Sequence, residues 1–138
     1  MSQENVEIVR AALDAWNEGD LDALRELHDP TIIFKPVEGW PESGPFVGRE
    51  EVMGFFDRLG EAWDTNAFEP TSFVDAGDRV VVRIVWRGTF QGPETSMQLS
   101  GVYTLRKGRI LYTEVFWDHA EALEAVGLSE QDAYADSS

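Results

Sequence analysis

The stretch that decides the fold is "DRVVVRIVWRGTF", residues 78–90, in which β-branched and aromatic residues outnumber all others. Such residues favour β-strands, and successive side chains of a strand point to opposite faces. One predicted face is wholly apolar and is expected to point inward: Val80, Val82, Ile84 and Trp86. The other face mixes apolar and basic residues: Val81, Arg83, Val85 and Arg87.

Three further runs have the same strand composition: "TSFVDAG" (71–77), "TSMQLSGVYTL" (95–105) and "RILYTEVFW" (109–117). Short turns rich in glycine separate them, which predicts an antiparallel meander. In the last strand, the predicted inward set is Leu111, Thr113, Val115 and Trp117, and the outward set is Ile110, Tyr112, Glu114 and Phe116. We expect Glu114 to pair with Arg83 across the outer face.

The first half of the chain has helical periodicity instead. Apolar residues spaced by three or four predict helices over 4–16, 21–27 and 49–64, with a strand over 31–37 and a loop over 38–48. Asp118 and Glu121 form a plausible capping box for a last helix. Helices segregated to one side of an antiparallel sheet define the α+β class.

Composition limits the protein to one domain. We expect a single domain over residues 1–128 and an acidic, disordered tail over 129–138. The formal charge of -15 disfavours nucleic acid and anionic membranes as partners. The absence of cysteine and the charged N-terminus, with Glu4, Glu7 and Arg10, favour a cytoplasmic location.

The order of elements and several phrases resemble the nuclear transport factor 2-like superfamily, in particular its SnoaL-like and ketosteroid-isomerase-like members. The phrases are "WNEGDLDALRELHDP" (16–30), "FVGREEVMGFF" (46–56), "GDRVVVRIVWRG" (77–88) and "GRILYTEVFWD" (108–118). This resemblance implies a cone-shaped barrel of curved antiparallel sheet packed on three N-terminal helices. It also implies an internal pocket for a small molecule and a homodimer.

The catalytic residues of the isomerases are not found at the matching positions. The position of their general base, directly before the proline of the first strand, is Lys35 here. Their donor tyrosine falls near Ala12, and their assisting aspartate falls on Gly101. The inward position that the epoxide-hydrolase relatives require on the last strand is Val115. Neither mechanism is expected to transfer unchanged to this chain.

Two residues remain as catalytic candidates. An inward Lys35 can act as a base, a Schiff-base nucleophile or an anchor for an anion; otherwise its stem packs on Phe34 or Trp40 while its ammonium reaches water. Tyr103 can donate to a carbonyl or simply belong to the core. The predicted pocket consists of Trp16, Lys35, Trp40, Phe55, Val82, Trp86, Leu99, Tyr103, Thr113, Val115 and Trp117.

No metal site or cofactor is predicted, because His28 and His119 lie at element ends without three converging ligands. Two functions stay open. One is a protein that binds a small apolar or aromatic molecule and acts on it as a metal-independent isomerase, cyclase or hydrolase. The other is a non-catalytic carrier, sensor or dimerisation module. Apolar residues on the outer sheet face, including Val81, Val85, Tyr112 and Phe116, predict a homodimer through that face.

Overall fold

The computed structural model describes residues 2–129 and 131, and it confirms the α+β class. The helices are α1 (Ser2–Glu18), α2 (Leu21–Glu26), α3 (Arg49–Ala62) and α4 (His119–Glu124). The strands are β1 (His28–Lys35), β2 (Phe46–Val47), β3 (Thr65–Ala76), β4 (Arg79–Thr89), β5 (Thr95–Arg106) and β6 (Arg109–Phe116).

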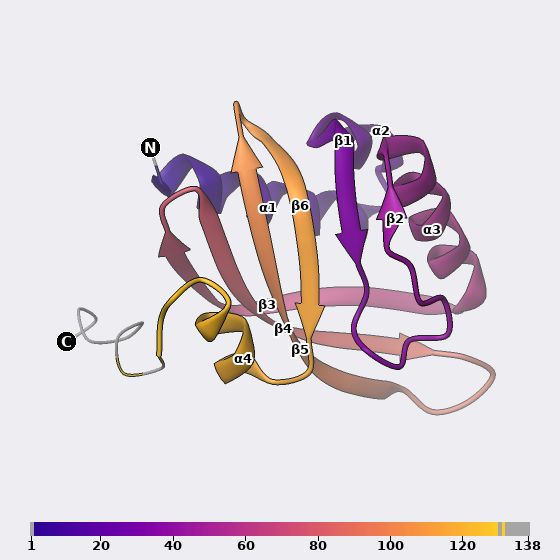
Figure 1. The fold of residues 1–138 in the computed structure, drawn as a ribbon. Coiled ribbons are helices and arrows are strands. Elements are labelled where there is room, and N and C mark those ends of the chain that lie inside the picture. Colours follow the sequence, from indigo (N-terminus) through magenta and orange to yellow (C-terminus); the bar gives the residue numbers. More distant parts are fainter. Residues whose placement is uncertain (1, 130, 132–138) are drawn as a thin grey trace.

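All strands belong to one curved sheet in the order β2-β1-β6-β5-β4-β3 (Figure 1). The predicted antiparallel meander is present from β3 to β6. The sheet as a whole is mixed, because β1 pairs with β6 in parallel. It is also open: β2 and β3 form its two edges and do not pair with each other, so the cone is not a closed barrel.

Three strand boundaries differ from the expectation. The strand predicted over 31–37 is β1, which begins earlier and ends earlier, at His28 and Lys35. The predicted loop over 38–48 contains the short strand β2, which pairs with β1. β3 begins at Thr65 rather than at residue 71 and continues through Pro70, next to a register shift against β4. A proline is tolerated there because β3 is an edge strand, where a missing N–H breaks no ladder on the open side.

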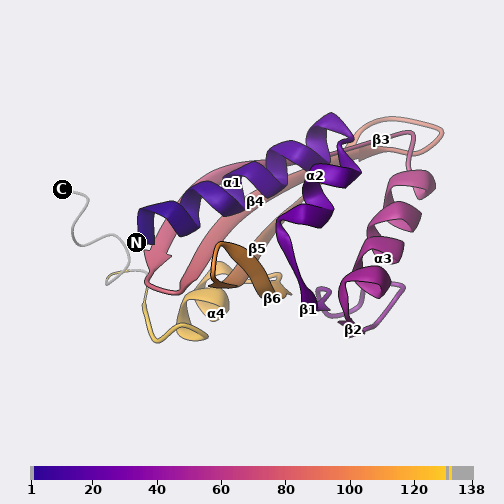
Figure 2. The same cartoon turned by 90° about the horizontal axis from the view of Figure 1, so that it is seen from above.

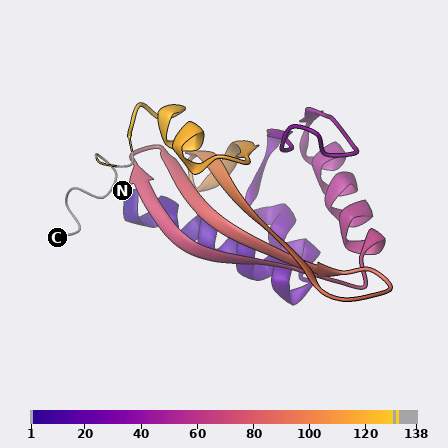
Figure 3. The ribbon, with the colours of Figure 1, turned by 90° about the horizontal axis from the view of Figure 1, so that it is seen from below.

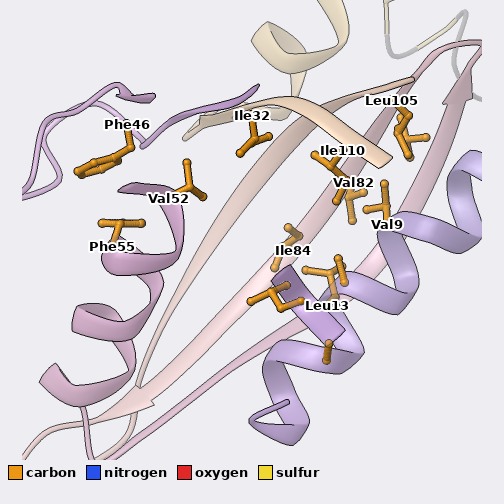
Figure 4. Packing of buried hydrophobic residues seen from close by; sticks show 14 of the residues in the cluster. Val9, Leu13, Ile32, Phe46, Val52, Phe55, Val82, Ile84, Leu105 and Ile110 are labelled. Carbon is orange, nitrogen blue, oxygen red and sulfur yellow. The ribbon is translucent and has the colours of Figure 1, made fainter. Parts of the chain in front are cut away.

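Helix α1 lies along the inner face of the sheet, and α3 stands beside it over the β1 end (Figure 2). The spacing that predicts α1 is explained by this contact, since Val9 and Leu13 are buried in the same cluster as Val82 and Ile84 of β4 (Figure 4). The inward face predicted for residues 80–86 is therefore the face that packs on the helices.

The start of β6 departs from simple alternation. Ile110 was expected to point outward, but it is fully buried in the inner cluster together with Leu105. The pairing of β5 with β6 shifts between Thr104 and Leu105, so that Leu105 lies opposite Ile110. A bulge of this kind changes which face the following residues take. The expectation that Leu111 would carry the inward contact there is wrong for the same reason.

The outer face of the sheet is partly covered by α4, on the side opposite α1 (Figure 3). Val81, expected to be exposed, is fully buried there in an outer cluster with the following residues: Val74, Val102, Ala122 and Leu123. The buried side chains of Ser100 and His119 join α4 to β5 by a hydrogen bond of 2.8 Å between Oγ and Nδ1. Sequence periodicity predicts α4 but not the face on which it docks.

In the part of the chain that the structure describes, no helix is both long and apolar enough to span a membrane. The predicted tail at 129–138 lies outside the described residues, apart from Ser129 and Gln131.

We predict that Leu123→Ala lowers the free energy of unfolding by about 2 to 4 kcal/mol, because it removes a fully buried side chain from the outer cluster. Urea denaturation measures this change. The control is Leu21→Ala, at an exposed leucine, with an expected loss below about 1 kcal/mol. Equal effects of the two substitutions would show that α4 does not pack on the sheet.

Candidate functional site

An internal cavity of about 100 Å³ lies between the inner face of the sheet and helices α1, α2 and α3. Most of the predicted pocket residues line it: Trp16, Trp40, Phe55, Trp86, Leu99, Tyr103, Thr113 and Val115. The structure therefore brings these predicted residues together around one hollow. That any of these side chains binds a ligand stays a prediction.

Three predicted pocket residues do not line the cavity: Val82, Trp117 and Lys35. Val82 is fully buried in the core cluster that contains Val9 and Leu13 of α1. Trp117 is 50% exposed, just beyond the end of β6. Its Nε1 donates a hydrogen bond of 2.8 Å to the backbone oxygen of Glu38, so it holds the loop that follows β1.

The third is Lys35, which was expected to point inward and does not. In the register of β1 with β6, Phe34 lies opposite Thr113 and Lys35 lies opposite Glu114. Phe34 therefore shares the inner face and lines the cavity, while Lys35 is on the outer face with its side chain 54% exposed.

The charged partner of Glu114 also differs from the expectation. Lys35 Nζ lies 3.2 Å from Glu114 Oε2, and Tyr112 donates a hydrogen bond of 3.2 Å to Oε1 of the same carboxylate. Arg83 is not the partner, because the sheet register places it opposite Ser100, which in turn lies opposite Phe116. The predicted ion pair between Glu114 and Arg83 is wrong, because β5 lies between β6, which carries Glu114, and β4, which carries Arg83.

Two fully buried polar atoms on the largely apolar wall have no hydrogen-bond partner in the described chain. They are Thr113 Oγ1, on a side chain that is only 1% exposed, and Trp16 Nε1. The indole groups of Trp86 and Trp117 are both satisfied, the former by Asn66 Oδ1 at 2.5 Å. Buried polar atoms are normally paired. Thr113 and Trp16 are therefore exceptions to this rule, each with an unpaired polar atom on the cavity wall.

Tyr103 adds a third polar group, next to Thr113 in the sheet. Its ring lies over Gly101, where an added Cβ would stand 2.8 Å from Cε1, so the glycine makes room for the ring. Burial raises the pKa of the Tyr103 phenol, which keeps it protonated. No hydrogen bond to its hydroxyl is present within the described chain, so the group is available as a donor.

His28 is a wall residue that the sequence analysis missed. It lies at the junction of α2 and β1, and it is only 2% exposed. Its Nδ1 donates a hydrogen bond of 2.7 Å to the carbonyl oxygen of Leu24, since a carbonyl can only accept. The four-residue separation from Leu24, one helical turn, is the only signal in the sequence for this contact.

The imidazole of His28 is held in its neutral form. Burial is the main cause that lowers its pKa, and the Arg49 guanidinium of α3 lowers it further; the bond to Leu24 opposes both. The residues that line the cavity include no aspartate, glutamate, lysine or arginine. Because an unpaired charge is costly to bury, this wall suits a neutral molecule.

An open curved sheet, with three helices on its inner face and an apolar cavity between them, places the protein in the nuclear transport factor 2-like class. Residues 9–113 match the model of the SnoaL-like domain. The chain belongs to this SnoaL-like family. No curated protein matches the sequence.

Solved structures of this class superimpose closely. An NTF2-like protein of unknown function from Burkholderia pseudomallei has a TM-score of 0.75 and 22% identity, over 91% of this chain and 98% of that chain. A ketosteroid isomerase-like protein from Catenulispora acidiphila, in complex with trimethylamine, has a TM-score of 0.72 and 22% identity, over 88% and 93%. TerC, co-crystallised with polyporic acid, has a TM-score of 0.75 and 20% identity, over 91% and 99%. These TM-scores show a shared fold, and at identities of 20–22% the matches show the fold alone.

We predict that Lys35→Met leaves the cavity unchanged, because the lysine is on the outer face. The loss of one half-exposed ion pair should change the free energy of unfolding by less than about 1 kcal/mol. The near-ultraviolet circular dichroism spectrum, which reports the packing of the buried aromatic residues, should be that of the wild type. A spectrum with altered aromatic bands would place Lys35 at the cavity after all.

Proposed function

We propose that the protein binds a small, neutral, largely apolar or aromatic molecule in the internal cavity. The observation that carries this proposal is the pair of buried polar atoms, Thr113 Oγ1 and Trp16 Nε1, that face no protein partner on an otherwise apolar wall. A ligand that reaches them gains hydrogen bonds that the protein alone does not make. Such convergent polar groups in an apolar pocket are typical of ligand sites.

The size of the cavity limits the ligand. Its volume of about 100 Å³ is smaller than the roughly 150 Å³ of a dry cavity that holds benzene. A rigid six-membered ring therefore needs more room than the enclosed space offers, so we expect a single-ring ligand to extend into the open mouth of the cavity and larger rigid molecules to be disfavoured. The structures with trimethylamine and polyporic acid support small-molecule binding by this fold.

We further propose that the bound molecule is a substrate for metal-independent isomerisation, cyclisation or hydrolysis. With Lys35 outside, the ionisable groups on the wall are His28 and Tyr103. The lowered pKa of His28 makes it a neutral base, and the raised pKa of Tyr103 keeps it a hydrogen-bond donor. A base and a donor on the same wall are the minimum that proton transfer requires.

A non-catalytic carrier, sensor or dimerisation module is the second candidate. It is favoured by the small volume of the cavity and by the aromatic residues that occupy the same space, such as Trp16, Phe55 and Trp86. Turnover distinguishes the two functions, since a carrier releases its ligand unchanged.

We predict that Thr113→Val weakens the binding of a polar single-ring ligand such as phenol about tenfold, because valine keeps the shape but removes the hydroxyl. The same change should leave the free energy of unfolding unchanged or raise it by up to about 1 kcal/mol, since no protein hydrogen bond is lost. Calorimetric titration and urea denaturation measure the two effects. Loss of stability without loss of affinity would assign Thr113 to the core alone.

We also propose a homodimer through the outer sheet face and a cytoplasmic location. Because α4 covers Val81, the face left for a partner is smaller than the sequence indicated and consists of half-buried residues that include Val85, Tyr112 and Phe116. Light scattering at micromolar protein should give the mass of a dimer. The mass of one chain would remove this proposal.

A further inference from the structure

Only one of the two ring nitrogens of His28 makes a hydrogen bond within the described chain. Nδ1 donates to Leu24 O within the turn between α2 and β1. The ring then lies edge-on to Phe56 of α3, with centroids 5.7 Å apart, and both side chains line the cavity. Nε2 makes no hydrogen bond within the described chain, although the side chain as a whole is buried.

The tautomer follows from the first contact. Because Nδ1 carries the hydrogen that Leu24 O accepts, Nε2 of the neutral ring bears a lone pair and can only accept. The other polar groups of the wall differ from it. Trp16 Nε1 can only donate, and the hydroxyls of Thr113 and Tyr103 can donate or accept. Among these four side chains, His28 is therefore the one whose free polar atom can only accept.

We propose that His28 Nε2 accepts a hydrogen bond from a hydroxyl of the ligand, so that the cavity selects neutral single-ring molecules that carry a hydroxyl group, of which phenol is the simplest. This inference rests on the proposed function, because it names the class of ligand for the same cavity. A ring of the same size without a hydroxyl would leave Nε2 unpaired in an apolar surrounding, and that loss is the basis of the selection.

The charged surroundings of His28 preserve the acceptor at neutral pH. Leu24 O of α2 and the Phe56 ring of α3 are uncharged neighbours, and Arg49 of α3 is the charged group that acts on the imidazole. A second positive charge is disfavoured beside this guanidinium. The pKa of His28 lies below its usual value of 6.5, so protonation converts Nε2 into a donor only on the acid side of that value.

The test compares three rings of similar size with the full chain at pH 7.5: phenol, toluene and benzaldehyde, the last of which can accept but not donate. We expect phenol to bind about tenfold more tightly than toluene. In His28→Asn, the amide nitrogen can still reach Leu24 O, but no group replaces Nε2. This variant should lose the preference for phenol and keep its affinity for toluene.

If His28→Asn does not fold, the pH dependence of ligand binding to the wild-type protein provides the test instead. On the acid side of pH 6.5, the gain of a proton turns Nε2 into a donor, so the affinity for benzaldehyde, which can accept but not donate, should rise relative to the affinity for phenol. Phenol itself stays neutral over this range.

Other outcomes would contradict either the role of His28 or the proposed function. Equal affinity for phenol and toluene, a preference for phenol over toluene that survives His28→Asn, or a ratio of benzaldehyde to phenol affinity that stays constant as His28 gains its proton overturns the role of His28 and leaves binding in the cavity intact. Tighter binding of benzaldehyde than of phenol also overturns it, and assigns the selection to the donors Trp16, Thr113 and Tyr103. If none of the three rings binds, the proposed function itself fails.

Discussion

The parallel pairing of β1 with β6 is the constraint on which the rest of the structure depends. It places Phe34 opposite Thr113 and thereby extends the inner row of the sheet from Tyr103 of β5 to β1. It also fixes the position of everything that follows β1 in the chain, because α3 must return over the inner face to continue into β3. The cavity is the space that remains between this returning helix, α1 and the curved strands.

Two glycines, Gly88 and Gly101, help to keep the cavity open on the side of the sheet. Tyr103 and Trp86 each fold over a glycine two residues away on the same strand face, where a Cβ would come within 2.8 Å and 2.6 Å of the ring. The large rings thus lie flat along the strands instead of standing up into the hollow. Trp86 is further fixed by its hydrogen bond to Asn66, whereas Trp16 has no such partner. Trp86 is thus fixed at both its ring and its polar atom, whereas the polar atom of Trp16 stays unpaired.

Sequence patterns correctly predict those features of the fold that depend only on neighbouring residues within one strand or helix. The inward face of residues 80–86 and the inward positions Thr113 and Val115 follow from alternation alone, and the α+β class follows from the order of elements. Lys35, Ile110 and Val81 were misplaced because their surroundings depend on long-range pairing: the register of β1 against β6, the bulge between β5 and β6, and the docking of α4. His28 was missed because a polar residue at an element end has a common structural explanation, and only the fold shows that it is buried.

Native mass spectrometry of protein purified from its own host tests most directly whether the cavity binds a small neutral molecule. We expect a bound neutral species with the mass of a single substituted ring. This species should be absent when the protein is first unfolded and refolded. A protein that is recovered only with its own mass, and that stays empty against a library of small metabolites, would contradict the account and favour a module whose aromatic residues fill its own cavity.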